Sequence, residues 1–221
     1  MKRLVLFLAL GAFQFGLAQV TKDPGDFDKV KVYDRISAEL IQSDANKVEI
    51  TGNRAKDVIV VNKNGELKLG MPATKLLQGE EIEAKIYYKS IKSVDGSEGA
   101  FISSAKSVSS PKLEITAKEG AEVKLPVDAE ILRVKSVTGA TIRLEGRASD
   151  SEISIGTGGI VEAQNLDTER TDVSINAGGE AEVKASRYVK ARTKAGGDIR
   201  IHGKPQTIDK KSILGGSITE E

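Results

Sequence analysis

Residues 153–183 read ISIGTGGIVEAQNLDTERTDVSINAGGEAEV and contain two copies of one pattern: an alternating segment, a glycine, and a second alternating segment. The same pattern continues along the chain on both sides of this stretch. Its glycines are separated by 19, 19, 20 and 18 residues: Gly120, Gly139, Gly158, Gly178 and Gly196. A constant period near twenty residues is typical of stacked structural repeats.

Apolar or small residues alternate with polar ones on both sides of each glycine. At the third and fifth positions after it stand Val123 and Leu125, Ile142 and Leu144, Val161 and Ala163, Ala181 and Val183, Ile199 and Ile201. At the fifth and third positions before it stand Ile115 and Ala117, Val134 and Ser136, Ile153 and Ile155, Val173 and Ile175, Ala191 and Thr193. A period of two with one apolar side predicts strands with one buried face.

The length of the repeat decides between architectures that have two strands per repeat. A propeller blade needs about 40 residues, whereas β-solenoid repeats have about 20. We therefore predict an all-β fold, a single-stranded right-handed parallel β-helix (β-solenoid) with coils of about 19 residues. The low aromatic content, 4% with no Trp, agrees with a narrow interior of stacked aliphatic side chains.

Glycine is expected at the corners of the coils because it adopts positive φ without a Cβ clash and lets a neighbouring backbone approach closely. The predicted structural coil corners are Gly99, Gly120, Gly139, Gly158, Gly178 and Gly196.

The N-terminus has the three parts of a secretory signal peptide. A basic start at residues 1–3 precedes an apolar run at 4–12 and a small-x-small cleavage site at 16–18. We predict that residues 1–18 are a signal peptide and that the mature chain, beginning at Gln19, is periplasmic, extracellular or on the cell surface. The apolar run is too short to span a bilayer, so we expect no transmembrane segment after cleavage. The chain has no Cys, so we expect neither a bacterial lipid anchor nor a disulfide.

The remaining residues are predicted to form one β-helix head domain, 19–205, followed by a C-terminal tail, 206–221. Coils should be looser over 26–110 and regular over 111–203, with each coil lying on the one before it. Residues 71–81 interrupt the alternation and are expected to form an insertion loop or a short helix. The tail is expected to cap the last coil, with three apolar residues packed over it: Ile208, Ile213 and Leu214.

Charge and motif content exclude several classes of function. The 33 basic and 32 acidic residues nearly cancel, which leaves no electrostatic footprint for nucleic acid. The single histidine, His202, is expected in a solvated position and cannot assemble a multi-histidine zinc site. The glycines at 156–159 match neither a dinucleotide fingerprint nor a Walker loop. We therefore predict no catalytic, cofactor-binding or metal-binding residues and no cofactor.

Outward-facing residues at the fourth position after each glycine form a charged row. Stacking should bring Arg143 over Glu162 and Glu182 over Arg200, so that they pair across coils. Carboxylates also cluster at 150–152, 167–172 and 180–182. A carbohydrate-active enzyme on a β-helix would need such carboxylates to converge in a groove along the strands, and the pattern favours solvated corners instead.

Several segments resemble a known bacterial family. They are residues 26–32 (DFDKVKV), 64–69 (NGELKL), the repeated glycine corners and 196–205 (GGDIRIHGKP). Over about residues 26–218 the chain resembles the exported family called putative autotransporter adhesin, head GIN domain, which is common in Bacteroidetes and is a domain of unknown function. The resemblance implies a β-helical head and an adhesin-like role.

Together these observations predict an exported, non-enzymatic β-helix module at the cell envelope, with an adhesion or ligand-binding role. Its partner would be a surface glycan or an envelope protein. Two alternatives stay open at this point: a carbohydrate-active enzyme on a β-helix scaffold, and a purely structural envelope protein.

Overall fold

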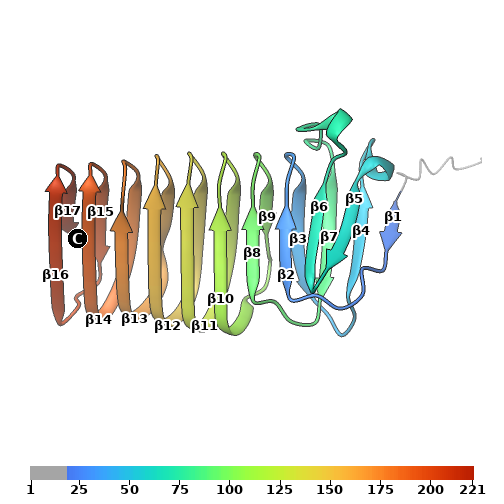
Figure 1. Ribbon diagram of the computed structural model, residues 1–221. Coiled ribbons are helices and arrows are strands. Elements are labelled where there is room, and N and C mark those ends of the chain that lie inside the picture. Colours follow the sequence, from blue (N-terminus) through green and yellow to red (C-terminus); the bar gives the residue numbers. More distant parts are fainter. Residues whose placement is uncertain (1–18) are drawn as a thin grey trace, which may run out of the picture.

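Figure 1 shows the chain as a rod of coils stacked side by side. This computed structural model describes residues 19–221, and the predicted signal peptide lies outside the described residues. The strands of residues 19–221 belong to a single 17-stranded sheet, which winds around the long axis of the rod. The prediction of a parallel β-solenoid with coils of about 19 residues is confirmed, and the rod has about 7 turns.

Four long parallel strands form the regular part of the rod: β11 (Glu122–Val137), β12 (Thr141–Gly156), β13 (Ile160–Ile175) and β14 (Glu180–Ala195). Each pairs in parallel with the next, so that Val123 lies beside Ile142 and Ile142 beside Val161. Each long strand also bends, and at the two ends of this regular part the halves of β11 and β14 pair with different short strands of the neighbouring coils. The rod therefore has two broad faces.

Face 1 contains the second halves of the long strands together with β2 (Lys29–Val32), β8 (Ser93–Gly96), β10 (Val108–Ala117) and β16 (Thr207–Leu214). Face 2 contains their first halves together with β3 (Ser37–Gln42), β9 (Phe101–Ser103), β15 (Asp198–His202) and β17 (Ser217–Glu220).

The core lies inside the rod, between the two faces, and consists of rows of side chains from successive coils. Val123, Ile142, Val161, Ala181 and Ile199 form one such row, and each is at most 1% exposed. A side chain in a row contacts mainly its neighbours in the two adjacent coils, so the core is continuous along the rod although each coil alone is too small to have one.

The six glycines expected at coil corners lie in the turns that lead from face 1 to face 2 of the next coil. All have positive φ: Gly99, Gly120, Gly139, Gly158, Gly178 and Gly196. In the earlier turns the residue before the glycine has positive φ as well, as at Glu119 and Thr157, which is the two-residue pattern of a type I′ turn. In the later turns a second glycine follows, as at Gly179.

The N-terminal part departs from the expected order of coils. The first coil, β2 and β3, pairs on one side with β6 (Glu66–Gly70) and β7 (Glu83–Tyr88) and on the other side with β8 and β9. The expectation that each coil lies on the preceding one is therefore wrong here. After β3 the chain passes to the end of the rod, returns as β6 and β7, and then crosses to the opposite side of β2 and β3.

Antiparallel strands close the N-terminal end of the rod. β4 (Lys47–Thr51) pairs with β7, β1 (Val20–Lys22) pairs with β4, and β5 (Ile59–Lys63) pairs with β6. A short 3₁₀ helix, η1 (Ala55–Asp57), connects β4 to β5. Because the end strands run against the coil direction, they terminate the parallel stacking.

The segment 71–81 projects beyond the turns of the coils (Figure 1). It contains the short 3₁₀ helix η2 (Ala73–Lys75), as its interruption of the alternation indicated. Asp34 anchors the segment from below, because its buried carboxylate accepts hydrogen bonds from the backbone N–H groups of Met71 at 2.7 Å and Leu77 at 2.8 Å. Among residues 19–221, no helix combines the length and the hydrophobicity needed to span a bilayer.

The C-terminal segment adds one more coil instead of folding over the last one. β16 and β17 pair in parallel with β14 and β15. The expectation that Ile213 and Leu214 pack over the core is wrong, since they are 57% and 74% exposed. Lys210 and Glu220 take the inward positions beside Ala191 and Ile201, and their side chains pair at 2.8 Å. An ion pair thus ends the apolar core at this end of the rod.

Candidate functional site

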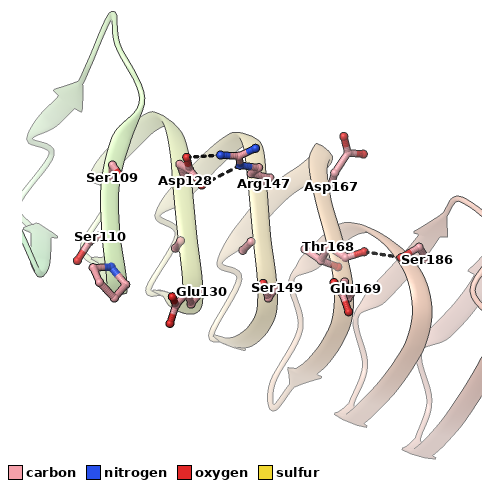
Figure 2. A pocket seen from close by; sticks show the side chains of 13 residues that line it. Ser109, Ser110, Asp128, Glu130, Arg147, Ser149, Asp167, Thr168, Glu169 and Ser186 are labelled. Atoms are coloured by element: carbon pink, nitrogen blue, oxygen red, sulfur yellow. Dashed lines mark hydrogen bonds and ion pairs between the residues drawn. The ribbon is translucent and has the colours of Figure 1, made fainter.

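A groove runs across the coils where the long strands bend (Figure 2). We call it the bend groove. It has a volume of about 510 Å³ and is lined by residues of five successive strands, β10 to β14. Its polar side chains are Ser109, Ser110, Asp128, Glu130, Arg147, Ser149, Asp167, Thr168, Glu169 and Ser186.

A row of small inward-facing residues underlies the bend groove. Ser110, Ala129, Ala148, Thr168 and Ala185 stack in register, and all are buried. The row of Val123, Ile142 and Val161, in contrast, consists of larger aliphatic side chains. Because interiors are close-packed, a row of small side chains brings the wall inward and leaves a depression outside.

Hydroxyl groups fix the floor of the bend groove near β13. The Thr168 and Thr171 hydroxyls are hydrogen-bonded at 2.8 Å, and the Thr168 hydroxyl donates to the backbone carbonyl of Lys184 at 2.7 Å. Thr171 is also bonded to the Ser151 hydroxyl at 2.8 Å, and the Ser186 hydroxyl donates to the Thr168 carbonyl at 3.2 Å. These bonds join three coils, so the groove is held in one shape.

Charged side chains along the bend groove pair across coils. Arg147 donates to both carboxylate oxygens of Asp128, at 2.8 and 2.7 Å, as Figure 2 shows. The hydrogen bonds from Arg147, and then its charge, lower the pKa of the Asp128 carboxyl. Further along, Asp167 pairs with Lys184 at 2.8 Å and Glu169 with Arg187 at 3.1 Å. Glu130 has no ion pair within residues 19–221.

The carboxylate clusters of an enzymatic alternative lie on outward positions and most are paired. Asp150 pairs with Arg170 at 3.6 Å, Glu152 with Arg133 at 3.3 Å and Asp172 with Lys190 at 2.6 Å. The expected pairs on face 2 are confirmed, with Arg143 to Glu162 at 2.9 Å and Arg200 to Glu182 at 2.9 Å. In the part of the chain that the structure describes, no group of three His, Cys, Asp or Glu residues is placed to hold a metal ion.

His202 is less solvated than expected. Its side chain is 24% exposed and lies between two carboxylates, with Nε2 at 3.3 Å from Glu182 and Nδ1 at 3.7 Å from Glu221. It is outside the bend groove, as are the six corner glycines, which line no part of it.

A second groove lies on face 2, before the bend. We call it the Phe101 groove. Its volume is about 490 Å³, and its lining comes from β3, β9, β11, β12 and β13 and the segment that follows β9. The lining residues are Glu39, Phe101, Ser103, Ser104, Ala105, Lys124, Leu125, Pro126, Arg143, Leu144, Glu145, Glu162, Gln164 and Asn165.

Neither groove follows from the alternation of polar and apolar residues, which reports only the inward or outward direction of a side chain. Two signals in the sequence would have indicated them. One is the alanine that recurs at the same place in several repeats, as at Ala129, Ala148 and Ala185. The other is the one repeat of 20 residues, which produces an irregularity in β13 beside the Phe101 groove.

Comparison with known proteins finds a family model and several solved structures that are similar to this chain. The family model described as putative auto-transporter adhesin, head GIN domain, matches residues 26–205. No curated protein matches the chain.

Solved structures similar to the chain include three proteins from Bacteroides and Parabacteroides. A putative adhesin from Bacteroides fragilis NCTC 9343 has a TM-score of 0.87 and 19% identity, over 94% of this chain and 98% of that one. A putative lipid binding protein from Parabacteroides distasonis ATCC 8503 has a TM-score of 0.74 and 19% identity, over 92% and 96%. A putative adhesin from Parabacteroides merdae ATCC 43184 has a TM-score of 0.70 and 22% identity, over 93% and 96%. At these identities the similarity shows a shared fold.

Proposed function

The chain belongs to the family of putative auto-transporter adhesins with a head GIN domain, and from this membership we propose that it is an exported, non-enzymatic binding module of the cell envelope. Its role would be adhesion to a glycan or protein at the surface, through the bend groove. The mature chain would begin at Gln19 and act in the periplasm or outside the cell.

The observation that carries this proposal is the continuity of the bend groove across coils. Five strands contribute to it, and at about 4.8 Å per strand they span about 19 Å along the rod. A groove of this length suits an extended polymer rather than a compact metabolite. Because its floor consists of stacked strands joined by hydroxyl bonds, the surface is preformed, and binding would not have to order it.

The electrostatics of the groove favour binding over hydrolysis. A general acid in glycoside hydrolysis needs a carboxyl whose pKa is raised. The pKa of Asp128 is shifted in the opposite direction by Arg147, and Asp167 and Glu169 are engaged with basic residues. Glu130, which has no ion pair within residues 19–221, is a single carboxyl group, whereas glycoside hydrolysis uses two. Paired side chains of this kind present a fixed pattern of charge to a ligand, which gives specificity.

A blocking substitution tests the proposal. Ser149 is exposed in the bend groove, so Ser149→Trp fills the groove without entering the core. The control is Ser174→Trp, which adds the same ring at a half-buried outward position of face 1, outside both grooves. The measurement is retention of purified residues 19–221 on native envelope fractions. We expect the wild-type protein and the control to bind and Ser149→Trp to bind at least about tenfold more weakly.

Each other result has a distinct meaning. Equal binding by all three proteins would show that the ligand does not bind in the bend groove. If the wild-type protein does not bind, the result would favour the alternative of a purely structural envelope protein. Release of soluble sugar products from envelope polysaccharide by the wild-type protein would support the carbohydrate-active enzyme.

A further inference from the structure

The Phe101 groove differs from the bend groove in its chemistry. The described part of the chain has two phenylalanines, Phe27 and Phe101. Phe27 is 5% exposed and belongs to the core, whereas Phe101 is only half-buried and lines the groove. Phe101 also takes an outward position on face 2, in register with Ser37 and Glu122. The other outward residues of this row are polar except Ile160, and an aromatic ring there is informative because packing of the core does not require it.

A β-bulge brings two amide side chains to the same groove. Arg143 pairs with Glu162, but Glu145 pairs with Asn165, so β13 has one residue more than β12 in this interval. The extra residue makes the spacing from Gly158 to Gly178 20 residues instead of 19. Gln164 and Asn165 at this bulge both line the groove. Bulges occur preferentially beside binding sites because they redirect side chains.

The Gln164 amide has unused hydrogen-bonding capacity. Its Oε1 is buried and has no hydrogen-bond partner. An unpaired buried carbonyl oxygen is unfavourable, and such groups in folded proteins need an explanation. If the side chain turned toward the groove when a ligand binds, the oxygen would accept a hydrogen bond from a ligand hydroxyl or N–H group.

The charges of the Phe101 groove argue against a strongly charged ligand. Glu39, Lys124 and Glu145 have no ion pair within residues 19–221, while Arg143 is engaged by Glu122 and Glu162. Free groups of both signs lie in one groove, so a polyanion would meet the carboxylates and a polycation the lysine. Hydroxyl groups, in contrast, both donate to carboxylates and accept from an ammonium group.

The backbone of the groove argues against an extended peptide. A peptide strand gains affinity by adding to an exposed sheet edge. β11 and β12 lie inside the sheet: they pair with each other throughout the groove, and their outer ladders are interrupted only at Leu125–Pro126 and at the bulge beside Leu144. No continuous sheet edge is open there, and the groove offers mainly side chains, namely an aromatic ring, amides, hydroxyls and unpaired charges.

We propose that the Phe101 groove is a binding site for a neutral oligosaccharide. One sugar ring would lie on the Phe101 ring through its C–H groups, and its hydroxyls would bond to Gln164, Asn165, Lys124 and Glu145. The volume of about 490 Å³ corresponds to a short oligosaccharide. The proposal rests on the chain being a binding module, but its site is separate from the bend groove.

The test uses purified residues 19–221 on an array of neutral, uronic-acid-containing and amino-sugar oligosaccharides of two to six units. Any neutral oligosaccharide that binds is then titrated by calorimetry against three proteins: wild type, Phe101→Ala and Tyr188→Ala. The last is the matched control because Tyr188 is a half-buried aromatic residue of face 1, outside both grooves. We expect binding by the wild type and the control and a loss of about tenfold or more in Phe101→Ala. Asn165→Ala, at an exposed position, should weaken binding as well.

Three results would overturn this inference: no binding to any neutral oligosaccharide, binding confined to charged oligosaccharides, or neutral binding that Phe101→Ala and Asn165→Ala leave unchanged. The variant Ser149→Trp distinguishes a failure of this saccharide site from a failure of the adhesion proposal. If envelope binding depends on Ser149 while no neutral sugar binds, the adhesion proposal stands and the saccharide site is wrong.

Discussion

Single residues in the turns have two different physical reasons to be glycine. At Gly178 a Cβ atom would meet nothing within 4 Å, and only the φ of +57° favours glycine. At the neighbouring Gly179, with φ of +121°, a Cβ atom would lie 2.5 Å from the backbone oxygen of Gly159 in the adjacent coil. The first glycine permits the turn, whereas the second permits the coils to stack closely.

The two glycines should therefore respond differently to alanine. We expect Gly178→Ala to lower the free energy of unfolding by about 1–2 kcal/mol, through the left-handed conformation alone. Gly179→Ala should lower it by about 3 kcal/mol or more, since backbone atoms would have to separate as well. Urea unfolding of both variants measures the difference, with Gly178→Asn as a control because Asn tolerates positive φ. Equal losses at the two positions would contradict this account.

A second prediction at this scale concerns Asp128. Its folded-state pKa is held below the ordinary value of 3.8, so the pair with Arg147 stabilises the protein above that value and loses its effect as the pH falls through the lowered pKa. Arg147→Ala should raise the pKa of Asp128 toward 3.8, which an NMR titration of the carboxyl carbon measures. The variant and the wild type should differ in stability near neutral pH and converge in strong acid. An unshifted Asp128 titration would show that the pair is not maintained in solution.

The turn glycines also show what the sequence can and cannot predict for single residues. Positive φ was predictable at Gly120 or Gly158, because a glycine between two alternating segments indicates a turn. The close approach at Gly179 was not, because the atom that excludes a side chain belongs to Gly159, a residue of another coil. The grooves escaped prediction for the same reason. Their shape depends on which small residues, such as Ala129 and Ala148, come to lie in one row.

Among the elements, the last coil differs from those before it in the polarity of its interior. β16 and β17 continue both faces, but among their inward positions the aliphatic Ile208 and Ile218 are accompanied by Lys210 and Glu220. Inward-pointing charges at a sheet edge are a known protection against edge-to-edge association. The tail therefore ends the stacking through its composition, and the exposed Ile213 and Leu214 take no part in this.

The role of the Lys210–Glu220 pair is testable by making the end apolar. Lys210→Leu with Glu220→Leu should increase association of the rods, because the apolar core would then extend to the open edge. Deletion of residues 206–221 should do the same, since it uncovers the edge strands β14 and β15. Light scattering after size-exclusion chromatography measures the molar mass, with Lys211→Leu as an outward-facing control. A mass equal to that of the wild type for both changes would contradict the protective role.

Elements were predictable where one pattern repeats without interruption. The period of β11 to β14 determines both their inward residues and their neighbours, because each coil has only one place to stack. At the N-terminal end the inward residues of β2 and β6, such as Val30 and Leu67, also follow the alternation. The order of these strands along the rod does not follow from the alternation, because coils with similar apolar rows can stack in more than one order.

In the whole molecule, the order of the coils along the rod differs from their order in the sequence. β2 and β3 are near the start of the chain but have neighbours on both sides, whereas β16 and β17 have an open edge. Amide hydrogen exchange should follow the rod: β2 and β3 should exchange slowly, like β12, and β16 and β17 should exchange faster than these strands. Mass-spectrometric exchange at peptide resolution measures this. Fast exchange in β2 and β3 would contradict the observed order of coils.

The first coil, β2 and β3, has neighbours on both sides, and this affects how the rod can fold during synthesis. Synthesis begins at the N-terminus, yet Lys29 pairs with Glu66 and Ser93, residues that leave the ribosome 37 and 64 positions later. The order of the coils along the rod therefore differs from the order of translation, and β2 can complete its pairing only after both β6 and β8 have been made. A chain whose first coil is completed late would suit the export proposed above, because a secretion channel admits unfolded chains.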